Sequence, residues 1–88
     1  RDFSFVFDDK VSFAKIHAAV IGLGVKELRG LGPVEIFRGG AIASGSYSIL
    51  LRATFQSFDR TLRDDEIAGW TNAIVKALQA LGGRLRAQ

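Results

Sequence analysis

The sequence predicts an α+β fold of the split βαβ type, in which an antiparallel sheet carries two helices on one face. Two observations lead to this prediction. Apolar residues alternate with a period of two in some segments, as in strands, and recur at steps of three and four in others, as in helices. The chain has 88 residues, of which 48% are hydrophobic and 24% charged, which is the balance of one small folded domain over residues 1–88.

The first expected element is a strand over residues 1–7, because phenylalanine occupies every second position there: Phe3, Phe5 and Phe7. The pattern from residue 11 onward predicts a helix. Its apolar positions form one stripe at steps of three and four: Phe13, Ile16, Val20 and Leu23. Ser12 is the expected N-cap of this helix.

The middle of the chain is expected to hold two further strands. Residues 25–31 are ambiguous, and Gly30, Gly32 and Pro33 predict an irregular passage before a second strand over residues 34–38. After a glycine-rich turn, residues 47–58 give the clearest strand of the sequence. One of its faces is apolar, with Tyr47, Ile49, Leu51, Ala53 and Phe55.

A second helix is expected to start near Thr61, because residues 61–64 resemble a capping box. Its buried stripe comprises Ile67, Trp70, Ile74, Ala77, Leu78 and Leu81. Gly82 and Gly83 end it, and residues 84–86 are expected to form a short edge strand. The resulting order, βαββαβ, is the ferredoxin-like arrangement, which leaves one face of the sheet open to water.

The composition excludes most catalytic chemistry. The chain has no cysteine and one histidine, so it offers no disulfide, thiol nucleophile or common metal site. It begins at Arg1 and contains no methionine, and we therefore expect a fragment of a longer chain. No segment predicts a membrane span or a signal peptide, and a cytoplasmic location is expected.

The open face is where a binding site is expected. Alternation across the sheet places Ser4, Phe37, Ser48 and Arg52 there. An aromatic ring, small hydroxyl residues and a guanidinium suit an unstacked nucleobase with its phosphate. The plain alternative is that Phe37 only covers the sheet or tucks under the glycine-rich turn.

A local excess of arginines provides a second signal. Between residues 29 and 63 the sequence has five arginines against two acids, which suits a phosphate backbone but also an ordinary solvated surface: Arg29, Arg38, Arg52, Arg60 and Arg63. Arg38, Arg52 and Arg60 are taken as the expected RNA contacts.

Other polar residues have simpler explanations. His17 is interpreted as structural or surface-exposed because no metal or catalytic partner lies in register with it. Asp64, Asp65 and Glu66 suit the positive end of the second helix better than acid-base chemistry or magnesium binding.

Four stretches of the chain, residues 1–7, 34–39, 48–55 and 60–66, closely resemble one family. This family is the ferredoxin-fold anticodon-binding domain that ends the beta subunit of bacterial phenylalanine-tRNA ligase. The resemblance implies a class II parent enzyme of two alpha and two beta chains. The alpha subunit would carry phenylalanine activation with ATP and magnesium, and this domain would be non-catalytic and hold no cofactor. The implied partner of the domain is the anticodon stem-loop of tRNA-Phe.

The resemblance also assigns residues. The aromatic residue that stacks on an anticodon base in the family matches Phe37, and the small residues near that base match Ser4 and Ser48. The chain departs from the family at three positions. Phe37 replaces the usual tyrosine and loses its hydroxyl, Tyr47 replaces a common lysine that contacts phosphate, and Phe58 replaces a usual proline.

Two functions of other classes are considered on the residues alone, and the first of them is disfavoured. An acylphosphatase-type enzyme needs an anion cradle after the first strand, where Asp8 and Asp9 would repel phosphate. A ligand-sensing or dimerising regulatory module would instead use the sheet edge or a glycine-rich loop to bind a small metabolite.

Overall fold

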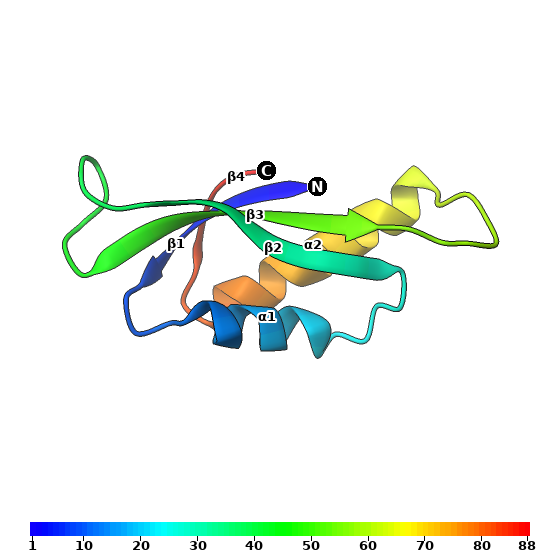
Figure 1. Ribbon diagram of the computed structural model, residues 1–88, viewed down its shortest axis with the longest axis horizontal. Helices are drawn as coiled ribbons and strands as arrows, with labels where there is room; N and C mark the ends of the chain where they lie inside the picture. The colour runs from blue at the N-terminus through cyan, green and yellow to red at the C-terminus, as the bar shows by residue number, and fades with distance from the viewer.

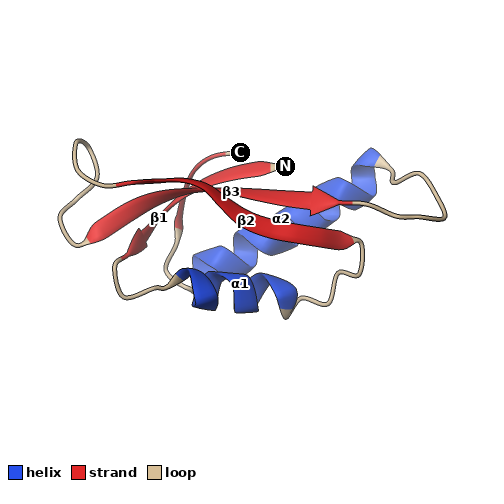
Figure 2. Cartoon of the chain, in the orientation of Figure 1, coloured by secondary structure: helices blue, strands red, loops and turns tan.

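Four antiparallel strands form one open sheet, and two helices lie together on one of its faces (Figure 1). The computed structural model describes residues 1–88. The elements are β1 (Asp2–Asp8), α1 (Phe13–Ile21), β2 (Leu28–Phe37), β3 (Ser46–Phe55), α2 (Asp64–Ala80) and β4 (Arg84–Ala87). The strand order is β2-β3-β1-β4, and the ferredoxin-like βαββαβ prediction is confirmed. In Figure 2 α1 and most of α2 lie below the sheet, and the first turns of α2 rise behind β3.

The register between β1 and β3 decides which side chains face the helices. Phe5 lies opposite Ile49, and both are fully buried. Ser4 lies opposite Leu50, and both are only partly buried. Because side chains alternate along a strand, one set of residues is committed to the core and the next set to the open face.

The core is built on the phenylalanines of β1. Phe3, Phe5 and Phe7 are at most 1% exposed, and fully burying a side chain of this kind stabilises the fold by about 1.5–3 kcal/mol. The helices contribute buried aliphatic side chains at helical spacing: Ile16, Val20, Ile74 and Leu78. At one end of the core the Phe55 ring stacks on Trp70, with ring centroids 5.4 Å apart. The predicted stripes therefore face the sheet, except that Leu23 lies beyond the end of α1 and is exposed.

The prediction for β2 was wrong in its start. The strand begins at Leu28, and the glycines and the proline that predicted an irregular passage belong to it. Two register shifts in its ladder with β3 explain the irregular pattern, one between Leu28 and Gly30 and one between Pro33 and Glu35. Each adds an unpaired residue, and β2 tolerates them because it is an edge strand with one partner.

The end of β3 and the start of α2 also differ from the prediction, while β1 and β4 differ from it by one residue. β3 ends at Phe55 and not at residue 58. α2 begins at Asp64, so Thr61 is not its cap; the N-cap is Arg63, whose backbone N–H donates to the Glu66 carboxylate at 3.1 Å. At α1, the Ser12 hydroxyl accepts from the backbone N–H of Lys15 at 3.2 Å, as expected of an N-cap.

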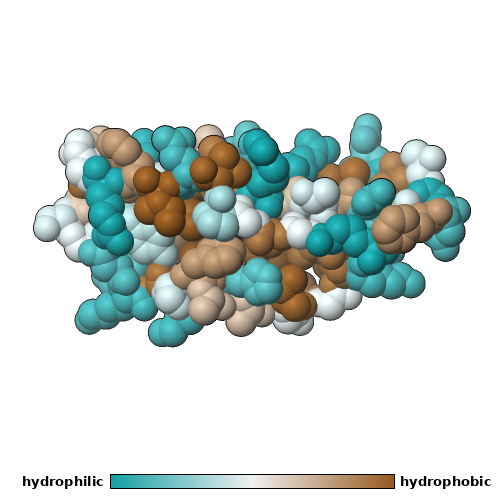
Figure 3. Space-filling view, in the orientation of Figure 1, coloured by the Kyte–Doolittle hydropathy of each residue, from teal (hydrophilic) through white to brown (hydrophobic).

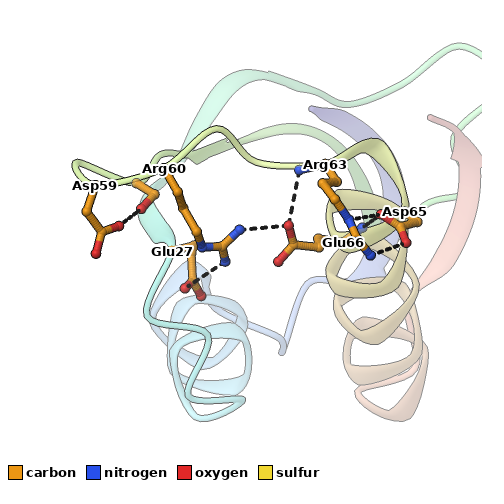
Figure 4. Close-up of polar contacts among 7 residues, drawn as sticks. Glu27, Asp59, Arg60, Arg63, Asp65 and Glu66 are labelled. Carbon is orange, nitrogen blue, oxygen red and sulfur yellow. Dashed lines mark hydrogen bonds and ion pairs between the residues drawn. The ribbon is translucent and has the colours of Figure 1, made fainter.

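The loop between β3 and α2 is fastened by Arg60 (Figure 4). Its guanidinium lies 2.7 Å from a carboxylate oxygen of Glu66 in the first turn of α2. The same group lies 3.6 Å from Glu27, just before β2, whose side chain is only 13% exposed. One arginine thus ties the loop both to the helix N-terminus and to the end of the sheet.

The outer surface is mixed in character. Val34 and Ile36 of the edge strand β2 are about half exposed, at 48% and 55%. In Figure 3 hydrophobic side chains on this side of the molecule lie in small groups between hydrophilic ones. Neither helix has the length and apolar character needed to cross a membrane.

Gly83 and Gly69 form a matched pair for testing the packing. A Cβ at Gly83 would lie 2.6 Å from a Phe7 ring carbon and 2.7 Å from the Leu78 carbonyl oxygen, whereas one at Gly69 would meet nothing within 4 Å. Gly83→Ala should therefore lower the free energy of unfolding by about 1–3 kcal/mol. Gly69→Ala, inside α2, should raise it by up to about 1 kcal/mol. Urea unfolding measures both, and equal effects would contradict the packing described.

The Arg60 bridge predicts how stability depends on pH. The Arg60 guanidinium, with a further contribution from the Arg63 backbone N–H, holds the pKa of Glu66 below its ordinary value. A carboxyl group with a lowered pKa in the folded state stabilises the fold above its unfolded pKa, about 4.3, and this stabilisation is lost as the pH falls below it. Glu66→Gln should therefore flatten the fall in unfolding free energy between about pH 5 and pH 2. Arg60→Gln should act in the same direction, and an unchanged acid profile in both variants would refute the bridge.

Candidate nucleic-acid interface

The strand registers arrange the open-face side chains in rows across the sheet. One row contains Ser4 on β1, Leu50 on β3 and Glu35 on β2. The next contains Val6, Ser48 and Phe37 on the same three strands. Phe37 therefore lies beside Ser48, and Ser4 lies one row away.

A shallow hollow of about 250 Å³ lies over these rows. Six residues from all four strands line it: Ser4, Glu35, Phe37, Ser48, Leu50 and Arg86. The structure thus brings together three of the residues singled out from the sequence, Ser4, Phe37 and Ser48. It adds an acid at the β2 side and an arginine from β4.

The ring of Phe37 lies on the open face, away from the helices. The side chain is 51% exposed, at the last position of β2. Its ring also lies close to the glycine-rich turn, since a Cβ at Gly40 would be 3.7 Å from two ring carbons. The turn therefore lies against the ring without burying the residue, and Phe37 remains accessible for stacking.

Arg52 also lies on the open face, but its guanidinium forms an ion pair with an acid. Its guanidinium donates to both carboxylate oxygens of Asp2, at 2.9 and 3.1 Å. The hydrogen bond from Arg52 holds the pKa of Asp2 below its ordinary value. The pair is exposed on both sides, and its two charges offset each other.

Arg38 and Arg60 lie outside the hollow. Arg38 forms an ion pair with Asp9, and its guanidinium lies 5.2 Å from the ring centroid of Tyr47, whose buried side chain belongs to the core. Tyr47 donates its hydroxyl hydrogen to the Val11 carbonyl, and burial raises its pKa. Since this side chain points toward the helices, a phosphate contact from position 47 is absent on the open face. Arg60 is held by Glu66 and Glu27, as described above.

The remaining arginines predicted from the local excess are also engaged. Arg63 forms an ion pair with Asp65 at 2.7 Å. Arg29 donates to the Gln56 carbonyl and lies 4.8 Å from the ring centroid of Phe58, which is 80% exposed. The arginine-rich segment is thus distributed over several small contacts, and it does not form one basic stripe.

Arg84 and Arg86 of β4 were not predicted as site residues from the sequence. Arg84 lies opposite Val6, an open-face residue, and Arg86 lines the hollow and donates to the Ser48 hydroxyl at 3.4 Å. The alternation of Arg84, Leu85 and Arg86 was a signal for this placement. This alternation shows which face of the sheet the two arginines occupy only once β4 is known to pair with β1.

The other candidate groups lie elsewhere. His17 sits on α1 beside Phe13, with ring centroids 5.9 Å apart. Asp64, Asp65 and Glu66 occupy the first turn of α2. No group of three or more histidine, cysteine, aspartate or glutamate side chains is arranged to hold a metal ion.

Comparison with known proteins finds relatives that are all phenylalanine-tRNA ligase beta subunits. The chain is 34% identical over 98% of its length to the phenylalanine-tRNA ligase beta subunit of Syntrophotalea carbinolica. It is 32% identical over 98% of its length to that of Streptococcus pyogenes serotype M1, and 33% identical over 99% to that of Bradyrhizobium diazoefficiens. In each case the match spans only 11% of the relative. The family model of the ferredoxin-fold anticodon binding domain matches residues 1–86, nearly the whole chain. The resemblance found in the sequence is thereby confirmed, and the chain belongs to the ferredoxin-fold anticodon binding domain family.

Proposed function

We propose that this chain is the tRNA-binding module of a phenylalanine-tRNA ligase beta subunit, and that the open face of its sheet binds the anticodon stem-loop of tRNA-Phe. The observation that carries the proposal is the half-exposed Phe37 ring in a hollow that it shares with Ser4 and Ser48. An unpaired base of the anticodon loop stacks on this ring, and the small serine side chains leave room beside it.

The module contributes affinity and orientation, and the chemistry takes place elsewhere in the parent enzyme. We further propose, from the family resemblance of the sequence, that the parent is an assembly of two alpha and two beta subunits in the cytoplasm. ATP and magnesium act there in phenylalanine activation, and the domain itself holds no cofactor. Binding the anticodon arm at the sheet positions the acceptor end of the tRNA for the distant active site.

The stacking role of Phe37 can be tested with its sequence neighbour as a control. Phe37→Ala should weaken binding of the tRNA-Phe anticodon stem-loop by about 1–3 kcal/mol, the usual worth of one aromatic stack. Ile36→Ala removes a comparably exposed side chain that lies opposite Ile49, on the other face of the sheet, and should leave the affinity unchanged. Fluorescence anisotropy at fixed salt measures both.

An unchanged affinity in the Phe37 variant, or equal losses in both variants, would exclude stacking on this ring. A native chain that ignores RNA, dimerises in light scattering and binds an amino acid would favour the ligand-sensing regulatory module.

The Asp2–Arg52 pair predicts a variant with tighter binding. Asp2→Asn removes a negative charge from the proposed RNA face and frees Arg52 for phosphate, so the affinity should rise and its salt dependence should steepen. Asp65→Asn makes the same change in net charge within the Arg63 pair on α2 and should have a much smaller effect. Titrations at two salt concentrations measure this difference. Equal gains in the two variants would show that net charge alone sets the affinity.

A further inference from the structure

Two arginines of β4 reach the open face without a carboxylate partner. Arg84 lies opposite Val6, and Arg86 lines the same hollow as Phe37. Four other arginines of the chain form ion pairs, but neither of these two does. Of the open-face arginines, Arg52 is neutralised by Asp2, so the uncompensated positive charge of this face lies on β4.

Arg86 already extends over the sheet. β1 lies between β4 and β3, so the Arg86 side chain must cross β1 to place its guanidinium 3.4 Å from the Ser48 hydroxyl. Val6, on the open face of β1 in the same row, is only 8% exposed, and Ser48 itself is 7% exposed. At 3.4 Å the bond to Ser48 is long for a hydrogen bond, so the guanidinium can exchange this partner for a better one at low cost.

The charges around the hollow are segregated by strand. Glu35 lies on the β2 side, in the row next to that of Phe37, and Arg86 lies on the β4 side. A phosphate is repelled by the carboxylate and attracted by the guanidinium, which matches its geometry with two parallel hydrogen bonds. A nucleotide in the hollow is therefore favoured in one orientation.

We propose that Arg86, with Arg84 beside it, binds the phosphates that flank the base stacked on Phe37. The bound strand then crosses the sheet with its base toward β2 and its backbone toward β4. In this complex Arg86 leaves the Ser48 hydroxyl and binds phosphate oxygens. The inference rests on the proposed function, because it assumes that a base occupies the Phe37 ring, and it adds the direction in which the nucleotide lies.

Salt dependence tests the proposal, using the 88-residue chain and the tRNA-Phe anticodon stem-loop. Arg86→Gln should lower the slope of log affinity against log salt concentration by about 0.7, the value for one phosphate contact on a single strand. Arg84→Gln should lower it in the same direction, and Arg86→Lys should retain most of the slope. Lys76→Gln removes the same charge from an exposed position of α2, on the helical side, and is the matched control with an unchanged slope.

Phe37→Ala separates failure of this inference from failure of the proposed function. If Phe37→Ala weakens binding while the Arg86 and Arg84 variants keep the native slope, the base is bound as proposed but its phosphates lie elsewhere, and the β4 inference is wrong. If neither Phe37→Ala nor the arginine variants change binding, the open face is not the RNA site and both proposals fail. If the slope falls equally in the Lys76 variant, the β4 arginines act only through the net charge of the domain, and the inference is overturned.

Discussion

The register of β1 against β3 is the constraint on which the rest of the structure depends. These central strands place Phe5 opposite Ile49 under the helices and Ser4 opposite Leu50 on the other face. A slip by one residue would turn the three phenylalanines into water and bring Ser4 into the core. Because burying each phenylalanine stabilises the fold by about 1.5–3 kcal/mol, such a slip is strongly disfavoured. The burial that stabilises the fold therefore also fixes which small side chains line the open face.

The arginines show why charge counting is a weak guide to an RNA site. The sequence has twelve basic residues against nine acids, but many of the arginines form ion pairs with acids of the same domain. Arg38, Arg52, Arg60 and Arg63 each lie against a carboxylate. A paired arginine contributes little to the field at a phosphate, because its partner cancels most of its charge. The arginines available to an anionic ligand are those that the sheet places on the open face without an ion-pair partner.

The fold was largely predictable from the sequence, and the site only in part. Alternation located β1 and β3, and helical spacing located α1 and α2, because burial on one face forces those patterns. The ion pair between Arg38 and Asp9 was not predictable, since these residues are 29 positions apart and meet only in the folded chain. Arg86 was missed for a related reason. Its contact with Ser48 spans 38 positions and depends on the order β4-β1-β3, which no local pattern specifies.

The start of β2 was missed because of the same irregularity that orients Phe37. Pro33 lies opposite Leu51, Val34 is the extra residue of a register shift, and Glu35 then lies opposite Leu50. A regular ladder continued from Pro33 would bring Phe37 opposite Tyr47, which faces the helices. With the extra residue, Phe37 lies opposite Ser48 on the open face. Bulges commonly redirect a side chain, and an edge strand with a proline can accommodate one. The segment that breaks the alternation in the sequence is thus the one that turns the aromatic ring toward the proposed RNA site.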